Sequence, residues 1–236
     1  AGSAANLAAY VPGLGSGQLA VLTNSTTHTL DLLVYSGVAP EIVWAGDGVN
    51  NYWSASANSY WKDSLGSPIQ YANADLVTFD DFGSNNLPVD LNVSSVYPGV
   101  ITVNSTNENY TIGTGGADSG NIISGGASLV KNGTGTLTLQ SANDYVAGTT
   151  INGGTIQLNG AGTSAAADGM IGAGPVTNNG VLIANNFTNS TIIGNISGSG
   201  LLVQQGVGKL TLVGDNTGFS GPVSVTNILQ VGIGVT

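Results

Sequence analysis

An internal repeat dominates this amino-acid sequence: residues 129–159 recur, imperfectly, at residues 202–232. Self-similarity at a fixed offset indicates that one supersecondary unit is stacked on itself. The unit consists of a strand, a turn rich in Gly and Asn, and a second strand. It therefore predicts an extended β architecture rather than a catalytic pocket. At an offset of 73 residues, the identical pairs are Leu129/Leu202, Val130/Val203, Gly133/Gly206, Gly135/Gly208, Leu137/Leu210, Thr138/Thr211, Leu139/Leu212, Asn143/Asn216, Gly148/Gly221 and Gln157/Gln230.

Short strand-forming segments run along the whole chain, and no window keeps a helical period of apolar residues for three turns without Gly or Pro. This spacing predicts an all-β fold. Two arrangements fit it: a β-solenoid (β-helix), in which turns stack at about 4.8 Å, and a β-sandwich of the jelly-roll type. We favour the solenoid because small residues permit sharp bends at its corners. Asn-Gly pairs, which suit tight turns, occur at Asn132, Asn152, Asn159 and Asn179.

The charge of the chain excludes several classes of partner. Only 7% of the 236 residues are charged, against roughly 25% in an average domain, and the formal net charge is −10. A chain of this charge repels phosphate groups, so we expect no nucleic-acid partner and no binding to anionic lipid. The sequence contains no run of 18 apolar residues, so we expect no membrane insertion. Cys is absent, which excludes disulfides and thiolate metal sites and is compatible with secretion.

Aromatic residues divide the chain into parts of different composition. All three Trp lie within residues 44–61, whereas Gly, Thr and Asn dominate from Gly113 onward. We expect three regions: N-terminal strands at residues 1–40, an aromatic-rich β domain at 41–112 and a repeat-containing β region at 113–236. Aromatic side chains in an aliphatic chain usually pack a core. A sugar-stacking platform built from the Trp residues is the alternative.

Two stretches resemble the autotransporter-associated β-strand repeat: GTGTLTLQSANDYVAGTTINGGTIQL (133–158) and GVGKLTLVGDNTGFSG (206–221). Residues 175–200 and 44–61 resemble the pieces that join and precede such repeats. The resemblance covers roughly residues 41–232. It implies an exported bacterial protein of the cell surface or the extracellular medium, often folded as a right-handed parallel β-helix. Because only two copies are present, we expect a small released or assembled subunit.

Candidate residues for chemistry are few. Asp80 and Asp81 offer carboxylate oxygens to Ca²⁺, and a turn after the preceding strand is the other interpretation. Asp144 and Asp215 flank the aligned Asn of the two copies, and turn capping explains them better than a glycosidase pair does. His28 is the single His, so it cannot build a His-rich zinc site. We expect no catalytic residue, no metal, no cofactor and no enzymatic activity.

Glycosylation is open for a secreted chain of this composition. Sequons of the form Asn-x-Ser/Thr are only slightly more frequent than expected for a chain so rich in Asn, Ser and Thr. They lie at Asn24, Asn92, Asn104, Asn109, Asn132, Asn186, Asn189 and Asn195.

The strand-forming segments near the two ends suggest assembly. Residues 228–235 alternate in polarity and place four apolar side chains on one face, and the N-terminal segments 18–22 and 30–35 are equally strand-prone. Strand addition between copies would cover both ends, and a head-to-tail contact that does not close generates a filament. The residues expected in these assembly strands are Leu19, Val21, Leu30, Leu32, Leu229, Val231, Ile233 and Val235.

Two functions compete on these observations. The first is a structural subunit of an extracellular filament or surface layer, joined by β-strand pairing, with other copies of the chain as its partner. The alternative is a surface adhesin or carbohydrate-binding module, with glycans as its partner.

Overall fold

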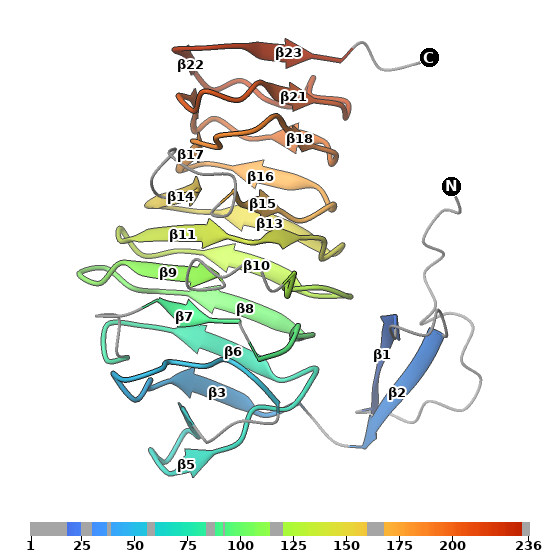
Figure 1. Cartoon of the computed structure of the whole chain (residues 1–236), viewed down its shortest axis with the longest axis vertical. Helices are drawn as coiled ribbons and strands as arrows, with labels where there is room; N and C mark the ends of the chain where they lie inside the picture. The colour runs from blue at the N-terminus through green and yellow to red at the C-terminus, as the bar shows by residue number, and fades with distance from the viewer. Residues whose placement is uncertain are drawn as a thin grey trace.

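The computed structural model describes residues 18–24, 30–36, 39–55, 60–83, 88–91, 93–113, 120–159 and 168–232. These residues form strands and connecting turns, and no helix occurs among them. Successive turns of the chain stack along one long axis as a β-solenoid (Figure 1). The prediction of an all-β solenoid is confirmed, and the sandwich alternative is wrong, because strands of successive turns pair in parallel and only β4 (Trp61–Lys62) and β5 (Pro68–Ile69), among the described strands of the stacked faces, add antiparallel pairings.

The solenoid has three faces, which enclose its core. The first face is a nine-stranded sheet, whose strands in spatial order are β19 (Ile196–Ser197), β16 (Val176–Asn178), β13 (Gly148–Ile151), β10 (Ser128–Lys131), β8 (Val100–Val103), β6 (Leu76–Phe79), β3 (Glu41–Trp44), β4 (Trp61–Lys62) and β5 (Pro68–Ile69). The second face has seven strands: β22 (Val223–Val225), β20 (Leu201–Gln204), β17 (Val181–Ala184), β14 (Thr155–Leu158), β11 (Thr136–Gln140), β9 (Tyr110–Gly113) and β7 (Val89–Asp90).

The third face is divided into two short sheets. One pairs β12 (Ala142–Asn143) with β15 (Met170–Ile171), and the other contains β18 (Ser190–Ile192), β21 (Leu210–Leu212) and β23 (Leu229–Val231). The strands of the aromatic-rich segment and of the repeat-containing segment lie in the same first and second faces. One apolar core therefore runs through both segments.

The two copies of the repeat occupy different faces. Three pairings along the first face lead from Leu129 in β10 to Ile196 in β19. Leu202, which is identical to Leu129 in the repeat, comes six residues after Ile196 and lies in β20 of the second face. The second copy is therefore three turns further along the axis and one face further around it. The strand-corner-strand unit fits any face, because the strands of every face alternate inward apolar side chains with outward ones.

Alternate side chains of each strand point inward, and equivalent positions stack in rows. One such row on the second face joins Leu137, Ile156, Leu182 and Leu202, each at most 1% exposed. Full burial of a Leu or Ile side chain contributes about 1.5–3 kcal/mol. The rows are thus the main source of stability along the solenoid.

An aromatic cluster fills the N-terminal turns. Trp44, Trp53 and Trp61 are at most 2% exposed. The ring centres of Trp53 and Trp61 lie 5.4 Å apart, and those of Trp53 and Tyr71 lie 5.7 Å apart in an edge-to-face arrangement. Edge-to-face contacts of this kind are favourable beyond their area burial. Because the three indole rings are buried, the sugar-stacking alternative for this segment is wrong.

Lys131 and Gln204 hold equivalent positions in the two copies, and both side chains are buried inside the solenoid. The Nζ of Lys131 donates a hydrogen bond to the carbonyl of Gly133. The Nε2 of Gln204 donates to the carbonyls of Gly206 and Gly208 at 2.9 and 2.7 Å. Burial lowers the pKa of Lys131 to about 8, because the ammonium loses hydration. The ammonium group of Lys131 in one copy and the amide group of Gln204 in the other thus both donate to the carbonyls of the Gly corner that follows.

Two of the repeated Gly residues are required by close approach between turns. Gly148 has φ of +103°, and a Cβ there would lie 2.6 Å from the carbonyl oxygen of Pro175. A Cβ at Gly221 would lie 1.8 Å from the carbonyl oxygen of Gly200. The identity of these two positions therefore has a steric cause at the corner that leads into β13 in the first copy and into β22 in the second.

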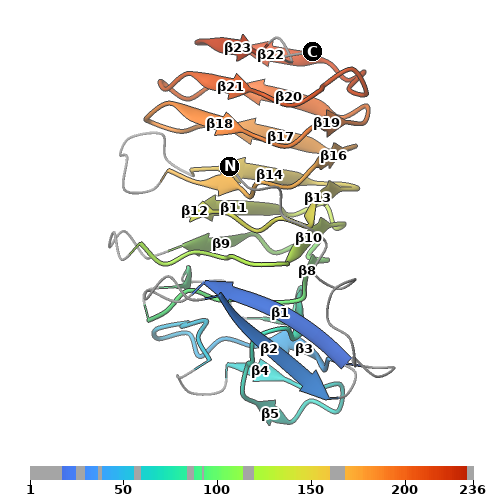
Figure 2. The same cartoon turned by 90° about the vertical axis from the view of Figure 1, so that its right-hand side faces the viewer.

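The expected assembly strands pair inside the chain wherever the structure describes them. β1 (Gln18–Asn24) and β2 (Leu30–Ser36) form an antiparallel pair beside the N-terminal turns (Figure 2). In this pair Leu19 lies opposite Tyr35, Val21 opposite Leu33, Leu32 opposite Leu22 and Leu30 opposite Asn24. Leu229 and Val231 pair with Leu210 and Leu212, whereas Ile233 and Val235 lie outside the described residues. Strand exchange between copies stays a prediction.

Candidate functional site: a polar groove beside the third face

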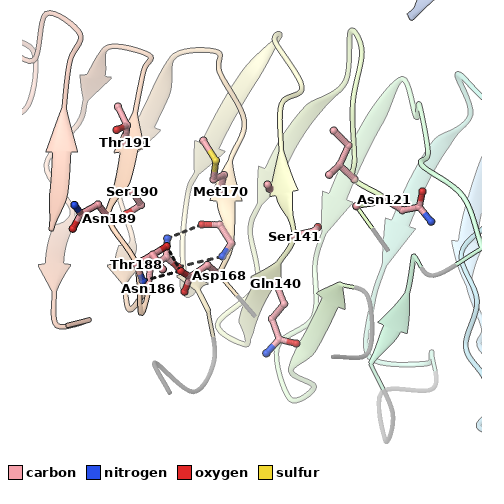
Figure 3. A pocket seen from close by; sticks show the side chains of 14 residues that line it. Asn121, Gln140, Ser141, Asp168, Met170, Asn186, Thr188, Asn189, Ser190 and Thr191 are labelled. Carbon is pink, nitrogen blue, oxygen red and sulfur yellow. Dashed lines mark hydrogen bonds between the residues drawn. The ribbon is translucent and has the colours of Figure 1, made fainter. Parts of the chain in front are cut away.

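A groove of about 380 Å³ opens at the corner where the second face meets the third (Figure 3). Four successive turns line it with residues 120–122, 140–142, 168–170, and 186 with 188–191. Amide and hydroxyl side chains make up most of this lining. The groove is therefore a polar surface that crosses the turns along the solenoid axis.

The groove coincides with a break in the hydrogen-bonded ladder of the third face. β15 and β18 contact each other, yet they belong to separate sheets. The side chain of Asn186, which is 3% exposed, bridges this break. Its Oδ1 accepts from the N–H of Gly169 at 3.2 Å, and its Nδ2 donates to the carbonyl of Gly169 at 2.9 Å. An amide side chain thus replaces strand pairing here.

Asp168 anchors the corner loop beside this break. Its Oδ1 accepts from the Nδ2 of Asn159 at 2.7 Å and from the N–H of Phe187 at 2.6 Å. Its Oδ2 accepts from the N–H of Thr188 at 2.8 Å and from the hydroxyl of the same residue. With four donors on one carboxylate, Asp168 is a structural acceptor that holds the wall of the groove.

Asn143, which follows the groove residues 140–142 in the chain, joins three turns. Its Oδ1 accepts from the N–H of Ile123 at 2.9 Å, and its Nδ2 donates to the carbonyl of Met170 at 3.0 Å. In the second copy, the Oδ1 of Asn216 accepts from the N–H of Ile196 at 2.9 Å. Both N–H donors lie 20 residues before their Asn, so the identity of the two Asn residues follows from one shared contact between turns.

Several polar groups on the rim of the groove have no partner within the described part of the chain. No hydrogen bond joins the side chains of Gln140, Ser190 or Thr191 to any described residue. Asn189 uses its Oδ1 to accept from the N–H of Lys209 at 2.9 Å. The rim therefore presents donors and acceptors, while the bonded side chains beneath it keep the groove in shape.

The acidic residues named in the sequence serve as acceptors for backbone N–H groups. Asp80 accepts from the N–H of Phe82 at 2.9 Å. Asp81 accepts from the N–H groups of Thr106 at 2.7 Å and Asn107 at 2.9 Å, across one turn. These bonds, that from Asn107 first, lower the pKa of Asp81. Among the described residues, no group of three or more His, Cys, Asp or Glu is placed to hold a metal ion.

The remaining candidates for chemistry lie apart. Asp144 follows β12 of the third face, and Asp215 lies beyond the end of β21, beside Asn195, three turns further along the axis, which corresponds to roughly 14 Å of axial separation. Glycosidase carboxylates lie about 5–10 Å apart. His28 lies outside the described residues. The described part of the chain contains no helix with the length and apolarity that a membrane crossing needs.

The sequons differ in access. Asn186 is buried with its amide bonded, so a glycan there would require local opening. The Nδ2 of Asn132 donates to Asn104 at 2.7 Å in an exposed ladder between turns. Asn92 lies outside the described residues, and only the backbone of Asn24 is described. The exposed sequon residues, where glycosylation stays a prediction, are Asn104, Asn109, Asn132, Asn189 and Asn195.

No motif in the sequence marks the groove residues as a site. One signal does exist in the lengths of the turns. Ser128 pairs with Gly148 after 20 residues, whereas Thr149 pairs with Val176 after 27. The groove lies beside this longer turn, to which residues 168–170 belong.

Comparison with known proteins agrees with the repeat. The model of the passenger-associated-transport-repeat family matches residues 129–158 and 202–227. The chain is also 33% identical, over 121 residues, to the adhesin BmaC autotransporter of Brucella suis biovar 1 (strain 1330). That match takes in 44% of this chain and 4% of the relative, so the chain spans a small part of the relative's length. No solved structure matches the chain.

Proposed function

Because it carries two passenger-associated transport repeats, the chain belongs to the autotransporter-associated repeat family, and we propose that it forms part of an adhesin passenger. It is a bacterial protein of the cell surface or the extracellular medium. The observation that carries the proposal is the 33% identity with an adhesin autotransporter over 121 residues. In this function the solenoid is a stiff support that displays a binding surface on its side.

The architecture supports an adhesive role. Inward rows of aliphatic side chains make the solenoid rigid, and its outward faces are free to carry polar contacts. The groove adds a shaped surface whose rim groups Gln140, Ser190 and Thr191 have no partner among the described residues. A binding surface on a rigid element loses little entropy when its ligand arrives.

The filament hypothesis finds no support in these observations. β1 pairs with β2, and β23 pairs with β21, within one chain. A relative that matches part of this chain is named an adhesin. The alternative from the sequence, a surface adhesin, therefore becomes the proposed function.

We also propose that this part of the protein is not an enzyme. Among the described residues that line the groove, Asp168 is the one carboxylate, and its oxygens accept from four donors of the surrounding chain. Hydrolysis of a glycosidic bond ordinarily needs two carboxylates on either side of the bond. Incubation of the chain with labelled polysaccharides is expected to release no fragments.

Adhesion is tested with beads. Fluorescent beads that carry the purified chain are expected to adhere to cultured epithelial cells at several times the level of albumin-coated beads. Soluble chain added in excess is expected to compete. Adherence at the albumin level on every surface would overturn the proposal. Filaments seen by electron microscopy at rising protein concentration would instead support the filament hypothesis.

A further inference from the structure

We infer that the groove beside the third face binds a short, uncharged stretch of glycan that lies along the solenoid axis. The inference rests on the proposed adhesive function and names the ligand class.

The length of the groove suits a chain molecule. Its lining comes from four successive turns. Parallel strands stack about 4.8 Å apart, so the lining extends for roughly 14 Å along the axis. A ligand with an extended backbone can therefore reach all four turns at once.

The chemistry of the rim matches sugar hydroxyls. A side-chain amide offers donors and an acceptor, and a hydroxyl offers both as well. Gln140 presents these groups from the end of β11 in the second face, and Ser190 and Thr191 present them from β18 in the third face (Figure 3). Ile122 and Met170 add half-buried apolar surface to the same groove, against which the C–H face of a sugar ring can pack.

The backbone beside the groove does not invite a peptide strand. Strand addition needs unpaired N–H and C=O groups. The N–H and C=O of Gly169 are bonded to Asn186. The N–H of Met170 donates to Ser141 at 2.9 Å, and its carbonyl accepts from Asn143 at 3.0 Å. A ligand held by side chains is therefore favoured over an extended peptide.

The charge of the site selects against acidic sugars. No Lys or Arg lines the groove, and Asp168 adds a carboxylate to its wall. The chain as a whole carries a formal charge of −10. Sialylated, sulfated or uronic-acid ligands would be repelled and would find no cation to pair with. Binding of an uncharged glycan is expected to change little with salt.

The test uses a panel of uncharged oligosaccharides of three or four sugars, with sialylated and sulfated forms of the same backbones. The doubly substituted chain Gln140→Ala/Thr191→Val is expected to lose about tenfold in affinity, because two hydrogen bonds are removed. Thr150→Val is the matched control, since Thr150 is a half-buried β13 residue on the first face with no side-chain bond within the described chain. Circular dichroism checks that all variants fold.

Met170 supplies a second readout, because it is the single Met of the sequence. A ¹³C-methyl label on it gives a resonance from the groove itself, which an uncharged glycan is expected to shift. An unshifted resonance, equal affinity of the groove variant and the control, or a preference for acidic glycans would overturn the inference. Cell adhesion of the groove variant separates the two proposals. Full adhesion without glycan binding removes the groove ligand and leaves the adhesin.

Discussion

The N-terminal turns and the repeat turns follow the same backbone plan but fill it with different side chains. The first turns enclose a cluster of aromatic rings, with the ring centres of Trp44 and Trp61 5.0 Å apart in an edge-to-face arrangement. The repeat turns enclose rows of Leu and Ile, such as the row that includes Leu137 and Ile156. Rings join many neighbours at once, whereas an aliphatic row joins each turn mainly to the next. The difference indicates that one end is a cooperative cap and the rest a stack of similar steps.

The largest effect is expected in the aromatic cap. Trp53→Ala should lower the free energy of unfolding by about 3–5 kcal/mol, because Trp53 is fully buried among Trp61, Tyr71 and Phe79. Urea denaturation followed by circular dichroism measures the change. Phe82→Ala is the control, since Phe82 is 93% exposed and its loss should stay within about 0.5 kcal/mol. Equal losses of unfolding free energy for the two variants would contradict a stabilising role of the buried aromatic rings.

The two copies of the repeat can be compared through their shared Asn. Asn143→Ala should cost about 3 kcal/mol, because it leaves the N–H of Ile123 and the carbonyl of Met170 unpaired in a buried place. Asn216→Ala should cost about 1 kcal/mol, since Asn216 is only half-buried. Thermal denaturation of both variants gives the order. A larger loss at Asn216 would show that burial does not set the value of this contact.

The two copies differ in charge at one buried position, where the first has Lys131 and the second has Gln204. Burial lowers its pKa in the folded chain to about 8, from 10.5. The unfolded chain therefore binds more protons between these values, and stability rises as pH increases from about 8 to 10.5. Lys131→Gln, which installs the residue of the second copy, should abolish this rise and stabilise the chain by about 1 kcal/mol at pH 7.

The test follows the free energy of unfolding from pH 7 to 10.5 in both chains. Lys209→Gln removes the same charge from a half-buried position and is the control. A slope that persists in Lys131→Gln would assign it to other groups.

The smallest effect on stability is expected from Asp75, which belongs to the N-terminal turns that contain the aromatic cap. Burial raises its pKa to about 6, although the N–H of Ala72 donates to it at 2.7 Å. Because the folded-state pKa lies above the unfolded value, stability falls as pH rises from about 4 to 6. Asp75→Asn keeps an acceptor for Ala72 and should gain on the order of 1 kcal/mol at pH 7. Denaturation at pH 4 and 7 measures it, and an equal gain at both values would contradict burial as the cause.

Much of the fold follows from local patterns in the sequence. Strand alternation, Gly/Asn corners and the recurrence of 129–159 predict a solenoid, and the described strands confirm it. The Trp residues are predicted to pack a core, and they do. The groove has no such pattern. Asn186 matches a glycosylation sequon, yet its amide bridges a break between β15 and β18 that is visible only when the turns are stacked.

The sequence by itself determined the strands, the corners and the low charge, because each depends on residues close together in the chain. The tertiary structure decided which face each copy occupies and where the third face breaks. These outcomes depend on turn length, since 20 residues bring Ser128 to Gly148 whereas 27 bring Thr149 to Val176. Turn length sets which side chains meet across turns, and the groove lies beside the 27-residue turn.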